Sequence, residues 1–311
     1  MTRARQQFTA FLCALGLVTL LTSGCATLRH TAVNQMGNAL AEGSTAFASD
    51  DDPELVRTAA PFSLKLIESL LADNPGHRGL RLAAASGFTQ YAFAFIETDA
   101  EEKQASDVDA ALVLRQRARR MYLRARDHAL AGLAVDHPNF TAQLRVNPAA
   151  AVAQLNREDV PLAYWAAASW AAAISVLKTD TDLIADLPLV DALATRALAL
   201  DEAWNAGAIH GFFIRYELVR PGGTVAAARA HFERARALSE GRQAAPFVAL
   251  AESVAVKEQN RAEFEALLHS ALTLNPDAYP DCRLANLIMQ RRAQFLFLMN
   301  MSLNFIMTLT Y

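Results

Sequence analysis

One long stretch of this chain is apolar on every face that a helix would present. Residues 160–177, VPLAYWAAASWAAAISVL, carry no charged side chain, and seven of them are alanine. A helix that is apolar all round must be buried on every side. The stretch is also just long enough to cross a membrane, but alanine contributes little hydrophobicity. We therefore predict the buried central helix of an all-α fold in preference to a membrane span.

The spacing of apolar residues predicts further helices on both sides of this stretch. They cover residues 53–72, 77–96, 106–135, 189–200, 204–219, 225–238, 245–257, 261–274 and 281–298. The side chains of the first helix expected to face the core are Leu55, Ala59, Phe62, Leu66, Ser69 and Leu70. Residues 140–158 are expected to form an irregular insertion, and strand-like alternation of useful length does not occur.

Three of these helices end at similar sequences, and their ends are evenly spaced. The ends at Leu200, Leu238 and Leu274 are separated by 38 and 36 residues. This period is close to the roughly 34 residues of a tetratricopeptide repeat, whose A-x₃-F-x₂-A spacing occurs within residues 228–235. We therefore predict a tetratricopeptide-like array of helical hairpins around the central helix, spanning residues 53–298.

The N-terminus has the layout of a bacterial lipoprotein signal peptide. Arg3 and Arg5 precede the uncharged residues 8–21, and small residues then lead to Cys25. A positive region, a short apolar region and a small-residue cleavage site are typical of secretory signals. Lipidation of Cys25 is the favoured interpretation, and an ordinary secretory signal cleaved near Ala26 is the alternative.

This interpretation divides the N-terminal region into two segments. Residues 1–24 would be the signal peptide, and residues 25–52 would form the lipidated tether with a short helix. One departure from the usual pattern is Thr22, which stands where a leucine is common. Several acyl chains on one cysteine give stable attachment to a membrane. Because no acidic residue follows Cys25, we expect a periplasmic protein that is anchored to the outer membrane.

The charge of the chain gives no reason to expect a nucleic-acid partner. It has 29 basic and 32 acidic residues, for a net charge of −3. Six arginines do cluster within residues 115–126, as in a nucleic-acid or lipid-headgroup patch. We interpret this cluster as the solvated outer face of a helix, balanced by Asp107, Asp109 and Asp127.

Catalytic and metal-binding motifs are missing from the sequence. It has no HExxH, GxSxG, CxxC or phosphate-binding glycine loop, and its seven histidines lack metal-ligand spacing. Once Cys13 and Cys25 are accounted for, Cys282 is the one remaining cysteine, so no intramolecular disulfide can form. We therefore predict a protein that is not an enzyme and has no cofactor and no metal.

Several stretches form a recognisable combination when they are taken in order: residues 32–41, 47–75, 86–95, 157–173, 198–210, the turn at 222–223 with 228–235, and 283–296. Together they resemble the T-component (TatT) lipoproteins of TRAP-type uptake transporters. The resemblance implies a periplasmic, tetratricopeptide-like helical lipoprotein that assembles as a trimer. It also implies docking of the transporter's substrate-binding protein and a cavity for a hydrophobic ligand.

The C-terminal end departs from the family pattern. Residues 295–311, FLFLMNMSLNFIMTLTY, carry no charge, whereas the family usually has a short polar end. Three hypotheses remain open: a longer capping helix, a poorly packed tail altered by a shifted reading frame, and a weak membrane segment. We treat residues 299–311 as an atypical apolar tail.

Candidate ligand contacts are aromatic or polar residues on the expected inner helices. An alanine-rich helix leaves space beside its aromatic rings, which favours the set Tyr164, Trp165, Trp170, Trp204 and His210. Asn286 and Arg291 lie close together on the last helix and could orient an acidic head group. For each of these residues, simple packing in the core is the alternative.

Two functions from different classes follow. The first is a lipid-anchored component of a TRAP-type uptake system that binds a hydrophobic or organic-acid small molecule and docks the substrate-binding protein. The second is a general tetratricopeptide-like periplasmic adaptor or scaffold for protein partners. An apolar tunnel would favour the first function, and an open polar concave face would favour the second.

Overall fold

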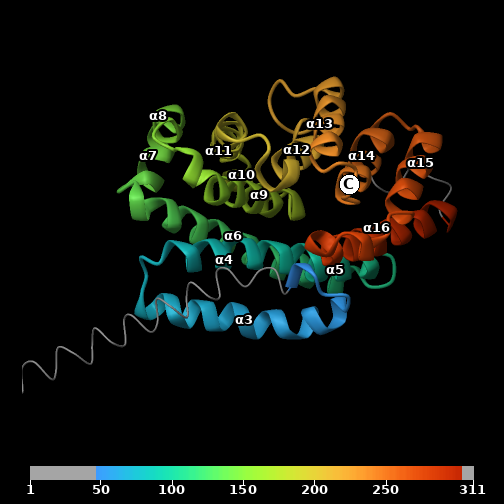
Figure 1. The fold of residues 1–311 in the computed structure, drawn as a ribbon, viewed down its shortest axis with the longest axis horizontal. Coiled ribbons are helices and arrows are strands. Elements are labelled where there is room, and N and C mark those ends of the chain that lie inside the picture. Colours follow the sequence, from blue (N-terminus) through green and yellow to red (C-terminus); the bar gives the residue numbers. More distant parts are fainter. Residues whose placement is uncertain (1–46, 303–311) are drawn as a thin grey trace, which may run out of the picture.

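The computed structural model describes residues 47–302, which fold into packed helices (Figure 1). None of the described residues lies in a β-strand. The predicted all-α class is therefore confirmed, whereas the tetratricopeptide arrangement and the domain limits stay predictions. The signal peptide, Cys25, most of the tether and the last nine residues of the apolar tail lie outside the described residues.

The N-terminal half is a stack of antiparallel helices. Its elements are α3 (Pro53–Asp73), α4 (Arg78–Tyr91), the π-helix η1 (Ala92–Glu97), α5 (Thr98–Lys103) and α6 (Val108–Asp136). In Figure 1, α3 packs beneath α4, and α4 packs beneath α6. The start of α3 is as expected: Asp52 Oδ1 accepts hydrogen bonds from the backbone N–H groups of Glu54 and Leu55, both at 3.0 Å.

The side of α3 that was predicted to face the core is wrong, because the buried side chains lie on a neighbouring side of the helix. The buried side chains are Val56, Leu64, Ile67 and Leu71. By contrast, Leu55 is 57% exposed and Phe62 is 74% exposed. Both sets recur at helical spacing, so the period alone could not decide which face α4 covers.

The segment expected to be irregular instead forms two short helices, α7 (Phe140–Val146) and α8 (Pro148–Ala153). Asn147 ends the first helix and caps the second, because its Oδ1 accepts from the N–H of Ala150 at 3.1 Å. Two side chains of α7, Phe140 and Leu144, are buried. The short 3₁₀-helix η2 (Arg157–Asp159) then leads into the central helix.

The uncharged stretch forms α9 (Val160–Val176), and its central place is confirmed. It packs against α4, α6, α11 and α12. Its small side chains allow such a close approach that a Cβ on Gly132 of α6 would lie 2.8 Å from Leu162 Cδ2. One face remains partly exposed, however, at Pro161, Tyr164, Trp165, Ala168, Ala171 and Ala172. The helix is therefore buried on most of its circumference, but not on every side.

The C-terminal half continues as a series of helices, each packed on the next. Its elements are α10 (Thr181–Ile184), α11 (Leu187–Leu200), α12 (Trp204–Tyr216), α13 (Val225–Leu238), α14 (Ala245–Leu250), the π-helix η3 (Ala251–Ala255), α15 (Arg261–Leu272), the 3₁₀-helices η4 (Pro276–Ala278) and η5 (Pro280–Cys282), and α16 (Arg283–Ser302). The repeat-like positions Ala228, Phe232 and Ala235 are all buried.

The last helix includes the start of the predicted apolar tail. Helix α16 extends to Ser302, and Leu296 is buried in the C-terminal core. The start of the tail is thus a continuation of the last helix, as the capping-helix hypothesis expects. Among residues 47–302, no helix is both long enough and apolar enough to cross a membrane.

Three consecutive residues at the start of α12 have left-handed backbone conformations. The φ angles of Asn205, Ala206 and Gly207 are 47°, 53° and 83°. Residues other than glycine and asparagine rarely adopt this region, which costs energy at each position. A Cβ on Gly207 would also lie 3.0 Å from the Cβ of Leu238 on α13. Glycine is therefore required at this position both for its φ angle and for the close packing of α13.

We expect Gly207→Ala to lower the free energy of unfolding by about 1–3 kcal/mol, because the new methyl group meets both an unfavourable φ angle and Leu238. Gly211 on the same helix is the matched control, since a Cβ there has open space. Gly211→Ala should leave stability unchanged or raise it by up to about 1 kcal/mol. Urea denaturation followed by circular dichroism measures both effects, and equal stability of the two variants would contradict this account.

Candidate functional site

Helices α9 and α12 together present a half-buried aromatic face. The ring of Tyr164 lies 5.0 Å from that of Trp165, 4.9 Å from that of Trp204 and 6.5 Å from that of Phe212, measured between centroids. All four side chains are partly exposed. Three of the predicted ligand contacts are thus brought together, and Phe212 is an additional member that sequence reasoning missed. We call these four residues the aromatic face.

The polar atoms of the aromatic face have no partners within residues 47–302. No hydrogen bond joins the Tyr164 hydroxyl or the indole N–H of Trp165 or Trp204 to another described residue, and the indole N–H of the buried Trp170 also has no partner. Burial raises the pKa of Tyr164 to about 12, so its hydroxyl stays protonated. The face therefore offers an apolar surface with three free hydrogen-bonding groups, which is the usual chemistry of a small-molecule site.

Two of the predicted contacts lie elsewhere. Trp170 is 1% exposed, and the guanidinium groups of Arg126 and Arg145 lie 4.9 and 5.7 Å from its ring centroid. His210 faces α13, where its Nδ1 lies 2.8 Å from Nδ1 of His231. The first therefore packs the core, as the alternative interpretation expected, and the second belongs to a histidine pair.

The two residues predicted to orient an acidic head group, Asn286 and Arg291, contact other parts of the protein instead. Asn286 is 1% exposed, and its amide binds the backbone N–H of Ala244 and the carbonyl of Arg242, both at 2.9 Å. Arg291 lies on the surface, where it pairs at 3.1 Å with Glu54 and at 3.1 Å with Glu102. Both residues hold α16 in place, and neither is brought to the aromatic face.

A cluster of charged side chains surrounds Phe93 of η1 and was not predicted. The guanidinium groups of Arg215 and Arg292 lie 6.0 and 5.4 Å from the Phe93 ring centroid. Arg292 donates two hydrogen bonds to the carboxylate of Glu101, at 2.8 and 3.1 Å. Its Nε donates to Glu252, which also pairs with Arg215. We call these five residues the Phe93 cluster.

Both described π-helices contribute to this cluster: η1 supplies Phe93, and η3 supplies Glu252. π-helical turns are rare in proteins, and many of those that do occur lie at functional sites. Glu97, also on η1, accepts a hydrogen bond from the Tyr122 hydroxyl, and burial followed by the charge of Glu101 raises the pKa of its carboxyl group. The Nε of Arg215 is buried without a partner. Arg215 and Glu97 therefore have hydrogen-bonding capacity to spare.

The histidine pair between α12 and α13 is joined by one hydrogen bond between the two Nδ1 atoms. At an Nδ1–Nδ1 distance of 2.8 Å, one ring must donate and the other must accept. His210 Nε2 lies 3.3 Å from Glu202. Burial is the main cause that lowers the pKa of both histidines, followed for His231 by the charge of His210.

We expect Arg292→Ala to lower the free energy of unfolding by about 3 kcal/mol, because it leaves the partly buried Glu101 without its arginine and Glu252 with Arg215 alone. The neighbouring exposed residue gives a matched control: Arg291→Ala should cost no more than about 1 kcal/mol. Thermal and urea unfolding of both variants test this. A loss of similar size in the two variants would show that the Phe93 cluster does not hold the helices together.

Stability should also fall as the pH is lowered from about 7.5 to about 5.5. The pKa values of His210 and His231 are lowered in the folded chain, so near and below about pH 6.5 the unfolded chain binds more protons. His231→Asn should flatten the dependence of the free energy of unfolding on pH in this window. His269→Asn, at an exposed histidine, should leave the slope unchanged.

Two comparisons with known proteins bear on the family of this chain. The family model described as "TRAP transporter T-component" matches residues 49–303. A protein of Treponema pallidum (strain Nichols), described as an uncharacterized protein, is 27% identical over 300 residues, which cover 89% of this chain and 92% of that protein. Because the match to the family model spans most of the 311 residues, the chain belongs to the T-component family of TRAP transporters.

Proposed function

We propose that this TRAP-transporter component binds a hydrophobic or organic-acid small molecule on its aromatic face and docks the substrate-binding protein of the system. The observation that carries the ligand-binding part is that the rings of the aromatic face gather from two helices and remain partly exposed. Side chains that only filled the core would be fully covered, as Trp170 is. Tyr164, Trp165 and Trp204 are partly exposed instead.

The strained backbone beside the aromatic face supports the same proposal. Trp204 immediately precedes the three left-handed residues of α12. Strain of this kind persists where the surrounding structure enforces it, and it clusters at ligand sites. The turn sets the position of the Trp204 ring against Tyr164, so the aromatic face is fixed before any ligand arrives.

An acidic head group on the ligand would meet Arg215. This residue follows Phe212 by three positions on α12, a rise of about 4.5 Å along the helix. Its side chain is 38% exposed, so a ligand carboxylate could reach the guanidinium group that pairs with Glu252. Arg215 therefore takes the role that sequence reasoning gave to Asn286 and Arg291.

The remaining parts of the proposal rest on the sequence and on the family. They are a lipid anchor at Cys25, a periplasmic location at the outer membrane, assembly as a trimer, and a role without catalysis. In this proposal the anchor keeps the ligand site near the membrane, and the substrate-binding protein docks onto the assembled subunits. An enclosed apolar tunnel beside α9 belongs to the same set of expectations.

Decanoate, a fatty acid with an apolar chain and a carboxylate, is a suitable probe. Binding to the purified full chain should quench the fluorescence of Trp165 and Trp204. Tyr164→Phe removes one free hydroxyl and should weaken binding about fivefold. Tyr279→Phe is the matched control, because Tyr279 lies between η4 and η5, which pack against α16. Its affinity should equal that of the unmodified chain.

Native mass spectrometry of the same preparation reports the number of subunits and any co-purified small molecule together. A trimer with a bound apolar molecule is the expected result. A monomer that binds neither decanoate nor any co-purified molecule would contradict the transport proposal. It would favour the general periplasmic adaptor for protein partners.

A further inference from the structure

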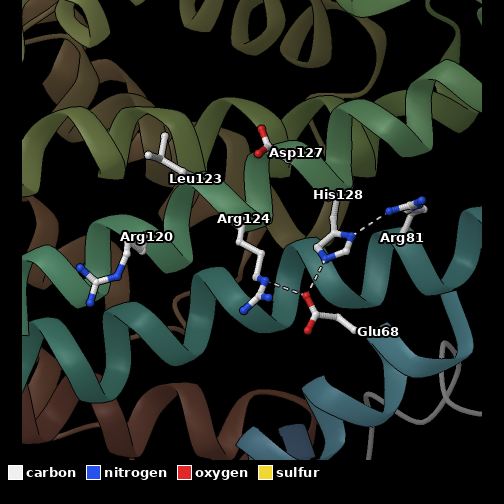
Figure 2. Close-up of a pocket in the computed structure, with 7 residues that line it drawn as sticks. All are labelled: Glu68, Arg81, Arg120, Leu123, Arg124, Asp127 and His128. Carbon is white, nitrogen blue, oxygen red and sulfur yellow. Dashed lines mark hydrogen bonds and ion pairs between the residues drawn. The ribbon is translucent and has the colours of Figure 1, made fainter. Parts of the chain in front are cut away.

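A cleft of about 450 Å³ opens between α3, α4 and α6, away from the aromatic face (Figure 2). It is lined by Glu68, Arg81, Arg120, Leu123, Arg124, Asp127 and His128. Two lining residues contact the buried Phe88: the His128 ring is stacked on its ring at 5.9 Å between centroids, and the Arg124 guanidinium lies 5.2 Å from its centroid. Three arginines from two helices therefore line this cleft, and Figure 2 shows Arg81 and Arg120 at its opposite ends with Arg124 between them.

Arg81 is the most unusual member of this set. Its Nε donates to the carbonyl of Pro75 at 3.0 Å, and its Nη1 lies 3.1 Å from Nδ1 of His128. No carboxylate pairs with it among the described residues, and burial lowers its pKa. A guanidinium held only by neutral acceptors keeps its full charge uncompensated within the cleft.

The carboxylates at the cleft do not balance its cations. Glu68 accepts from Arg124 at 2.7 Å and from Lys65 at 2.7 Å, and it also contacts His128 at 3.3 Å, as Figure 2 shows for the arginine and the histidine. Asp127 is bound by the neighbouring Arg126. Glu68 thus pairs with both Arg124 and Lys65, while Arg81 and Arg120 have no carboxylate partner among the described residues.

The shape and the charge together select a class of ligand. Guanidinium groups match the oxygens of phosphate through paired hydrogen bonds. A volume of about 450 Å³ is within the usual range of small-molecule sites and exceeds the needs of a bare ion. We propose that the cleft formed by Arg81, Arg120 and Arg124 binds a phosphate group, carried either by a small soluble molecule or by a phospholipid headgroup.

This assignment revises the interpretation of the arginine-rich segment as a solvated helix face. The sequence showed six arginines on α6, but it could not show that Arg81 of α4 joins two of them. Arg119, Arg124 and Arg126 do pair with carboxylates, as a solvated face would. Arg120 and Arg81 differ from these three, because neither pairs with a carboxylate among the described residues.

Isothermal titration of the full chain in a nonionic detergent at low ionic strength tests the proposal. One arm uses inorganic phosphate, a second uses glycerol 3-phosphate, and a third uses monomeric dihexanoyl phosphatidylglycerol. Saturable binding of one ligand per chain in the first or second arm would identify a soluble phosphate. Binding only in the third arm would identify a lipid headgroup. No saturable binding in any arm would overturn the proposal.

Variants separate a binding role from a structural role. Arg81→Gln should weaken binding about tenfold, and Arg120→Gln, which loses no contact within the described residues, should weaken it severalfold. The matched control is Arg117→Gln on the same helix outside the cleft, which should change affinity less than about twofold. Glu68→Gln should tighten binding, because it removes one of the two carboxylates that line the cleft and would repel the ligand. Equal affinities in the Arg81 and Arg117 variants, or weaker binding in the Glu68 variant, would contradict the proposal.

Discussion

Burial of the uncharged helix α9 is the constraint on which the rest of this structure depends. Its small side chains let α6 approach until Gly132 leaves no room for a Cβ beside Leu162. Helices α4 and α11 cover two further sides, and α12 covers part of the fourth. The same helix therefore forms the core with most of its surface and presents Tyr164 and Trp165 with the remainder. The candidate ligand site is a direct consequence of incomplete coverage of α9.

Sequence patterns were sufficient where a single interaction decides the structure. A run without charges can only be buried, so the position of α9 followed from composition. Asp52 before Pro53 gave the start of α3, because a cap and a residue without an N–H suit that position. The buried Ala228 and Phe232 of α13 followed from a short motif that records how paired helices pack.

Other features depend on which distant segments meet, and no local pattern contains that information. Helix α3 has apolar residues on two faces, and only the position of α4 decides that Phe62 is exposed. Arg291 looked free to bind a ligand, but Glu54, 237 residues away, pairs with it. The left-handed residues of α12 and the π-helices are backbone features that ordinary helical spacing conceals. Phe212 was missed because Tyr164, the ring that it meets on the aromatic face, comes from another helix.

The π-helix η1 has a consequence for the length of the chain. Such a turn corresponds to an α-helix with one inserted residue, and each inserted residue rotates everything after it by about 100°. That rotation aims Glu101 at Arg292 and Asp99 at Arg57, where the latter pair meets at 2.7 Å. Removing any one residue between Ala92 and Glu97 would leave a regular helix whose two carboxylates point away from their arginines. The number of residues in this segment is thus a stricter requirement of the fold than most of their identities.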